Sequence, residues 1–306
     1  MKKVLKWIGI ILGSLVGVLL VVMLGLYFKT KSQLNKTYDV QVQSIVIPTD
    51  VESIEHGRHL TEFLCAECHG DDLSGIPNWI SIPNLATVSP PNITSGKGSV
   101  TANFSDEDWI RVLRHGVKPD GHSVFVMPSE TFQYLSEEDL GDILAYMKTV
   151  PPVDSKENVK SQEFSFLGHV VYGAGAFGNL IIASKIDHEN PPTSFPEPGV
   201  TIEYGEYLVN INGCNSCHGT QFAGATPPDP QSVLAPNLTP AGDIGTWTEA
   251  EFIEAFRTGI VPSGRRLIPN FMPWTYKGKM TDDELKAIFL FLQSLPALPT
   301  STDPVE

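Results

Sequence analysis

The chain has 306 residues and a formal net charge of −14, from 21 basic and 35 acidic residues. Six of the basic residues and none of the acidic ones lie in residues 1–36, so residues 37–306 form a strongly acidic body. Such a body repels phosphate, which excludes nucleic-acid binding and favours a protein partner with a basic docking face. Hydrophobic residues make up 42% of the chain, and its length suggests about two domains.

The first feature along the chain is an apolar run. Residues 8–28 carry no charge and are rich in Leu, Val and Ile. As a helix rising 1.5 Å per residue they would be about 31 Å long, enough to cross a bilayer core of ~30 Å. No small-residue cleavage pattern follows, so we expect an uncleaved transmembrane anchor in residues 1–36 and a tether over 37–50. Three lysines lie on each side of the run, so the positive-inside rule does not set its orientation.

All four cysteines belong to two C-x-x-C-H motifs, at residues 65–69 and 214–218. This motif is the attachment signature of c-type haem, in which two thiols bond to the haem vinyl groups and the histidine ligates the iron. A zinc site would need further cysteine or histidine ligands, and the chain has no other cysteine. The sequence therefore predicts two covalently bound haem c groups, held by Cys65, Cys68, His69, Cys214, Cys217 and His218.

The chain repeats itself around these motifs. Residues 54–60 match 202–208, and a Pro-Asn-[Ile/Leu]-Thr segment follows each motif. Capped amphipathic helices follow in both copies, with apolar residues at i, i+3, i+4 and i+7. We predict an all-α fold made of domain one (51–153), a Pro/Gly-rich connector (154–200), domain two (201–300) and a tail (301–306).

A second uncharged stretch, residues 164–183, is interpreted as a buried part of this connector. A second membrane crossing there would place the two cysteine motifs on opposite sides of the bilayer, although both need the same attachment compartment.

The second axial ligand of each iron is expected further along each copy. No histidine follows His218, so Met272 and Met280 are the strong candidates in copy two, and Met272 precedes a proline. Met127 precedes a proline at the matching place in copy one. We predict the iron ligands to be His69, Met127, His218 and Met272. The rivals in copy one are His115 and His122, whose counterparts are Thr258 and Arg265. Arg114 and Arg257 are matched candidates for the haem propionates, or exposed helix ends.

Each half resembles a class I cytochrome c domain. The whole of 51–300 resembles the membrane-anchored cytochrome c subunits of bacterial alcohol, aldehyde, sugar and gluconate-type dehydrogenases. The resemblance rests on Gly-x-x-Leu ahead of each cysteine motif, the Pro-Asn-[Ile/Leu]-Thr segments and the two Met-Pro pairs. It implies that a proline carbonyl accepts the other ring N–H of each ligating histidine: Pro236 for His218, and Pro91 or Pro83 for His69. Those subunits commonly carry three haem motifs, and this chain has two.

Together these features predict a dihaem electron carrier with no catalytic residues of its own. It would pass electrons from a dehydrogenase to a quinone, a soluble cytochrome or a terminal oxidase of a respiratory chain. The alternative is a dihaem enzyme like cytochrome c peroxidase, with one open or displaceable distal site. Because c-type haem is attached outside the bacterial cytoplasmic membrane, we expect a single-pass protein of that inner membrane with its haem domains on the periplasmic side.

Overall fold

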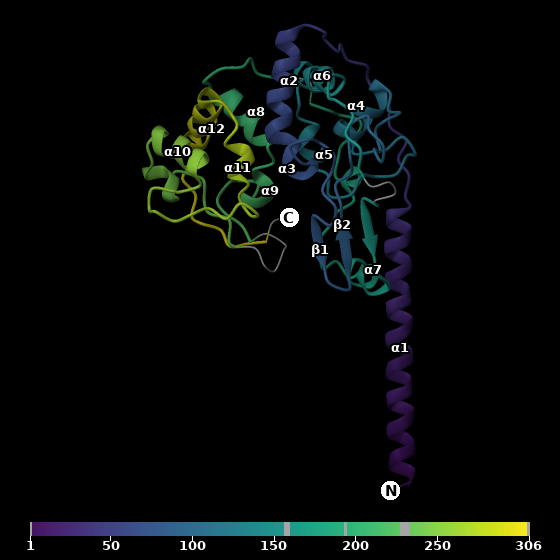
Figure 1. Ribbon diagram of the computed structural model, residues 1–306. Coiled ribbons are helices and arrows are strands. Elements are labelled where there is room, and N and C mark those ends of the chain that lie inside the picture. Colours follow the sequence, from purple (N-terminus) through teal and green to yellow (C-terminus); the bar gives the residue numbers. More distant parts are fainter. Residues whose placement is uncertain (1, 156–159, 193–194, 227–232, 305–306) are drawn as a thin grey trace.

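A long N-terminal helix projects from one end of the body of the protein (Figure 1). The computed structural model describes residues 2–155, 160–192, 195–226 and 233–304. Helix α1, Lys2–Leu34, is the one helix among these residues that is long and apolar enough to cross a membrane, and its most apolar window is not buried at all. The helix therefore continues past the apolar run that ends at residue 28, and its last turns reach the folded body.

The body is mostly helical, as predicted, and its two halves use α-helices in the same order, to which domain two adds the short 3-10 helix η2. Domain one contains α2 (Val51–Leu64), α3 (Ala66–His69), α4 (Asp106–His115), α5 (Ser129–Phe132) and α6 (Glu137–Met147). Domain two contains α8 (Ile202–Ile211), α9 (Asn215–His218), η2 (Asp243–Thr246), α10 (Glu249–Thr258), α11 (Trp274–Lys277) and α12 (Asp282–Ser294). Helix α2 packs against α6, and α8 packs against α12.

The helix ends follow from the local sequence. Ser105 and Thr248 cap α4 and α10, each in a reciprocal box with the acidic residue three positions later. Both helices stop at a glycine in the left-handed conformation, Gly116 at φ 62° and Gly259 at φ 70°. A left-handed residue at this place satisfies the last carbonyls of the helix, and glycine adopts it without steric cost.

A glycine lets the first and last helices of each half touch. A Cβ placed on Gly57 would lie 1.9 Å from the carbonyl oxygen of Asp142, and one on Gly205 would lie 2.0 Å from that of Ala287. No side chain fits at these crossings because the opposing atoms belong to backbone. The repeated glycine of the Gly-x-x-Leu pattern therefore fixes the helix pair that brackets each cysteine motif.

A small antiparallel sheet is an addition to the predicted all-α fold. Its strands are β1 (Ile80–Ile82), β2 (Ala86–Val88) and β3 (Gln162–Phe164), in the order β1-β2-β3. Strand β3 comes from the connector, so that segment joins domain one instead of only linking the domains. The connector also holds α7 (Phe166–Gly173) and η1 (Ile182–Ser184), and α7 packs against α1. The expectation of a buried connector is correct for residues 168–170, 172–173 and 181–183 and wrong for 165–167, 174–176 and 178–179, which are exposed.

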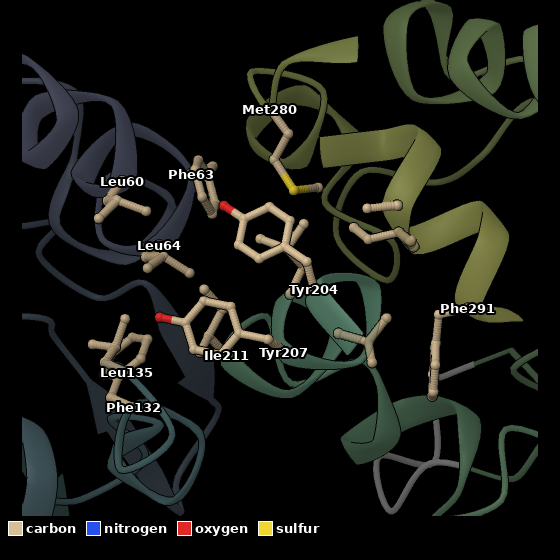
Figure 2. Packing of buried hydrophobic residues seen from close by; sticks show 14 of the residues in the cluster. Leu60, Phe63, Leu64, Phe132, Leu135, Tyr204, Tyr207, Ile211, Met280 and Phe291 are labelled. Carbon is tan, nitrogen blue, oxygen red and sulfur yellow. The ribbon is translucent and has the colours of Figure 1, made fainter. Parts of the chain in front are cut away.

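One hydrophobic cluster runs through both domains. Leu60, Phe63 and Leu64 of α2 lie opposite Tyr204 and Tyr207 of α8, as Figure 2 shows. Phe132 and Leu135 complete it on the first side, and Met280 and Phe291 on the second. The two halves are therefore packed as one body.

Candidate haem-binding site

Each cysteine motif forms a four-residue helix, α3 or α9, directly after the first long helix of its half. The ring Nδ1 of His69 lies 2.8 Å from the carbonyl oxygen of Pro91, and that of His218 lies 2.8 Å from the carbonyl oxygen of Pro236. A carbonyl accepts only from a protonated nitrogen, so each ring carries its proton on Nδ1 and leaves Nε2 free to bind a metal. Pro83 lies in the turn between β1 and β2.

The residues that hold these prolines in place were not singled out from the sequence. The side-chain amide of Asn92 donates to the carbonyl of Val153 at 2.7 Å, and that of Asn237 donates to the carbonyl of Leu298 at 2.8 Å. Each asparagine oxygen also accepts from the backbone N–H of the threonine two residues on. These bonds hold the proline loop against the segment that follows the last helix of its domain. The repeated Pro-Asn-x-Thr pattern was the signal, and its Asn and Thr carry this structural role.

The motif side chains lie in an apolar setting. Burial raises the pKa of the Cys65 and Cys68 thiols to about 12 and that of Cys214 to about 11, so these thiols stay protonated. Burial also lowers the pKa of His69 and His218, which keeps both rings neutral, although the proline carbonyls act in the opposite direction. A neutral imidazole with a free Nε2 is the form that ligates iron.

The two methionine loops have different surroundings. Met127 is partly buried against the shared core. Its loop pairs with the connector, since Phe125 bridges Ile181 and the N–H of Val126 donates to the carbonyl of Leu180. Met272 is also partly buried, but Ile268 in its loop has 47% of its surface exposed. The other copy-two candidate, Met280, is 2% exposed in the core, with its sulfur 3.8 Å from the Asn212 amide.

The rival histidines of copy one have other neighbours. His115 is buried with its Nδ1 3.2 Å from Nδ1 of His188 in the connector. Burial, helped by the positive charges of His188 and Arg114, lowers the pKa of His115 to about 4. His122 pairs through its backbone with Thr37, just after α1.

The Nη2 of Arg114 and the indole Nε1 of Trp274 are buried donors that have no hydrogen-bond partner within the described residues. Buried N–H groups without partners are costly, and the carboxylate of a haem propionate would satisfy them. Arg257 instead donates to the carbonyl of Gly278 and to Asp282. With the paired thiols and the free Nε2 atoms, these donors form a chemically suitable set for haem c in each half.

Two matching polar contacts cross the interface between the domains, and in each the first long helix of one domain meets the last helix of the other. The ring Nε2 of His59 in α2 lies 2.9 Å from the carboxylate of Glu284 in α12, and Tyr207 in α8 donates to the carboxylate of Asp139 in α6. Tyr207 is the counterpart of His59, and Glu284 is the counterpart of Asp139. The two domains therefore meet about an approximate two-fold axis.

Lys277 lies beside both cysteine motifs and departs from this symmetry, because domain one has no lysine at the matching position. Its ammonium donates to the carbonyl of Phe63 across the interface at 2.8 Å, and its positive charge acts on the thiols of Cys65 and Cys214. The matching position in domain one is Phe132. On that side Gly213, next to the second motif, packs against Thr131. The attachment loops of the two halves thus face each other across the interface.

Comparisons with known proteins agree with this geometry. Residues 202–296 match the family "Cytochrome c", and residues 52–147 match "Cytochrome C oxidase, cbb3-type, subunit III". These two segments cover α8–α12 and α2–α6, the two helical repeats described above.

Several curated proteins are similar along most of the chain. The fructose dehydrogenase cytochrome subunit of Gluconobacter japonicus is 28% identical over 83% of this chain and 54% of its own length. The cytochrome c subunit of the quinone alcohol dehydrogenase of Gluconobacter oxydans is 27% identical over 82% and 56%. A diheme cytochrome c-type of Cereibacter sphaeroides is 24% identical over 76% and 82%. The chain therefore spans about half the length of the first two relatives and most of the third.

Proposed function

Because the chain carries two cytochrome c domains, we propose that it is a membrane-anchored dihaem electron carrier that accepts electrons from a dehydrogenase and delivers them to a respiratory acceptor. The acceptor would be a quinone, a soluble cytochrome or a terminal oxidase. Haem c supplies one-electron chemistry at its iron. The comparisons give no support to the peroxidase alternative.

The chain would hold one haem c in domain one (51–153) and one in domain two (201–300). His69 and His218 supply Nε2 ligands whose orientation is fixed by Pro91 and Pro236. We propose Met127 and Met272 as the second axial ligands. The partners found for His115, and the core position of Met280, support this choice over the rivals.

The observation that carries the proposal is the meeting of the two cysteine motifs across one packed interface. Lys277 of domain two donates a hydrogen bond to the backbone carbonyl of Phe63, just ahead of the first motif. Its ammonium also interacts electrostatically with the cysteine thiols of both motifs. Two haem groups attached on either side of this interface would be close enough to exchange electrons directly. Direct electron transfer between two haem groups would need this closeness, whereas independent binding modules would not.

The anchor and the attachment chemistry support a location in the cytoplasmic membrane. Helix α1 would span the membrane once, and both domains would lie on the periplasmic side, where c-type haem is attached. The redox partner would be a dehydrogenase subunit. The acidic body favours a basic docking face on its partners.

The test is spectroscopic. The purified full chain should contain two c-type haems per polypeptide by the pyridine haemochrome assay. Its oxidised form should show the far-red methionine–iron charge-transfer band at the intensity of two haems. Met127→His and Met272→His should each remove about half of this band while leaving the haem content unchanged.

One haem per chain, haem that acid acetone extracts, or a band that survives both substitutions would refute the assignment. Steady-state reduction of hydrogen peroxide at enzymatic rates would replace the carrier with the peroxidase alternative.

A further inference from the structure

The last turns of α1 are bonded to the connector helix α7. Thr30 donates its hydroxyl to the carbonyl of His169 at 2.7 Å, and the Lys29 ammonium donates to the carbonyl of Gly173 at 2.9 Å. The rings of Tyr27 and Phe166 stack at 5.3 Å between centroids. These contacts fix α7 at the level of residues 26–30 of α1, where its apolar run ends.

The contact is too close to be incidental. A Cβ on Gly173 would lie 2.4 Å from the carbonyl oxygen of Leu26, so the two helices meet through backbone. The N-terminus of α7 is in turn bonded to the turn between β1 and β2, since Ser165 donates its hydroxyl to the carbonyl of Asn84 at 2.7 Å. Figure 1 shows α7 and this turn together at the end of the body from which α1 projects.

Two segments at this end of the body carry no formal charge, and the nearest charged side chains are those of Lys29 in α1 and Glu163 in β3. No Asp, Glu, Lys or Arg occurs in residues 73–96, which include the hairpin, or in residues 164–184, which include α7. On α7, Phe166 is 47% exposed and Leu167 is 44% exposed, in a protein whose surface is otherwise strongly acidic. An uncharged segment with exposed aromatic and aliphatic side chains is typical of a segment that lies in a membrane interface.

We propose that α7 lies in the lipid interface of the leaflet that α1 leaves, with Phe166 and Leu167 inserted among the acyl chains. This inference rests on the proposed membrane anchoring of α1. Because α7 is bonded both to α1 and to the hairpin of domain one, it would hold the haem domains at a fixed tilt to the membrane. A single anchoring helix followed by a free tether would leave that tilt undetermined.

The test maps lipid contact on the intact chain with both haems. The protein is reconstituted in phosphatidylcholine–phosphatidylglycerol vesicles that contain a lipid with a diazirine in its acyl chain. After illumination, mass spectrometry locates the lipid adducts. We expect adducts on α1 and also on Phe166 and Leu167. Ile268 of domain two is the matched control, because it is also 47% exposed but lies far along the chain from the anchor, and it should remain unlabelled.

Leu167→Gln should abolish labelling at position 167 and reduce it on Phe166, with unchanged haem content and visible spectrum as the check on folding. Adducts on α1 alone, or equal adducts on α7 and Ile268, would overturn the proposal. Labelling of α7 in vesicles that disappears in native membranes would also overturn it, since another protein would then cover this face. Absence of adducts on α1 itself would refute the anchor, a separate result.

Discussion

The two methionine loops occupy the same place in the repeat but have opposite surroundings. In domain one the loop before Met127 is covered by the connector, through Ile181 and Leu180. In domain two the matching stretch 268–270 is exposed, and so are Arg265 and Arg266 earlier in the same loop. The fold supplies two equivalent haem sites, and the segments outside the repeat make one of them more accessible than the other. We therefore expect domain two to exchange electrons with soluble partners and domain one to be shielded.

The largest effect is expected from substituting the matched glycines of the two domains, Gly57 and Gly205. Gly57→Ala and Gly205→Ala should each lower the free energy of unfolding by about 3 kcal/mol, because the new Cβ would overlap a backbone carbonyl. Guanidinium unfolding of the detergent-solubilised protein, followed by circular dichroism, measures this. Gly25→Ala is the control, since nothing lies within 4 Å of its Cβ position. Equal stability of all three variants would show that the helix crossings are looser than described.

The paired interface carboxylates should respond to substitution in opposite directions. Hydrogen bonds from His59 and Thr281 outweigh burial and lower the pKa of Glu284, whereas burial raises the pKa of Asp139 despite its bond to Tyr207. At pH 7, Glu284→Gln should lower the free energy of unfolding by about 2 kcal/mol. Asp139→Asn should raise it slightly, because the amide still accepts from Tyr207 without a buried charge.

The sign of the pH dependence follows from the same pKa shifts. Glu284 stabilises the folded protein above its ordinary pKa near 4.5, and this stability is lost as the pH falls through its lowered folded value. Asp139 takes up its proton earlier in the folded state, so acidification stabilises the folded form. Asp139→Asn should therefore approach the wild type in stability as the pH falls from 7 towards 4, and Glu284→Gln should do so only as the pH falls below about 4.5. A constant difference across these ranges would contradict the assignment.

The exposed loop of domain two can be tested by charge reversal. Arg265→Glu with Arg266→Glu should slow oxidation of the reduced protein by hexacyanoferrate(III) about tenfold at low ionic strength, since an anionic oxidant is then repelled. Stopped-flow absorbance measures the rate, and added salt should remove the effect. Lys118→Glu, in the corresponding loop of domain one, should change the rate little. If it slows oxidation as much, the two loops are equally accessible.

Lys277 should produce the smallest effect, because a single partly buried charge acts on both haem sites. Lys277→Met should lower both midpoint potentials, by on the order of 1 kcal/mol or about 40 mV for a one-electron couple. Lys277→Arg should retain most of the potential. Spectroelectrochemical titration measures both couples, and Lys279→Met is the control at a neighbouring exposed lysine. Unchanged potentials in Lys277→Met would show that the charge of this residue does not influence the haem sites.

Local sequence was a good guide wherever neighbouring residues decide the outcome. The capping residues Ser105 and Thr248 and the terminal glycines predicted the helix ends because capping involves residues only a few positions apart. The sheet was not predicted, because its strands are only three residues long and β3 comes from the connector, more than 70 residues after β2 in the chain. The exposed face of α7 was not predicted either, since an uncharged run reads the same whether it is buried or facing lipid.

The sequence by itself determined the chemistry of this protein: two C-x-x-C-H motifs, a repeated set of capped helices and one apolar N-terminal helix. Covalent attachment and helix formation depend on residues within a few positions of each other, so their signals are complete in the sequence. Only the tertiary structure decided that His59 meets Glu284, that Tyr207 meets Asp139, and that the connector covers one methionine loop while the other stays open. These contacts join residues far apart in the chain, and they are selected by packing and by the pairing of buried polar groups, which no local pattern encodes.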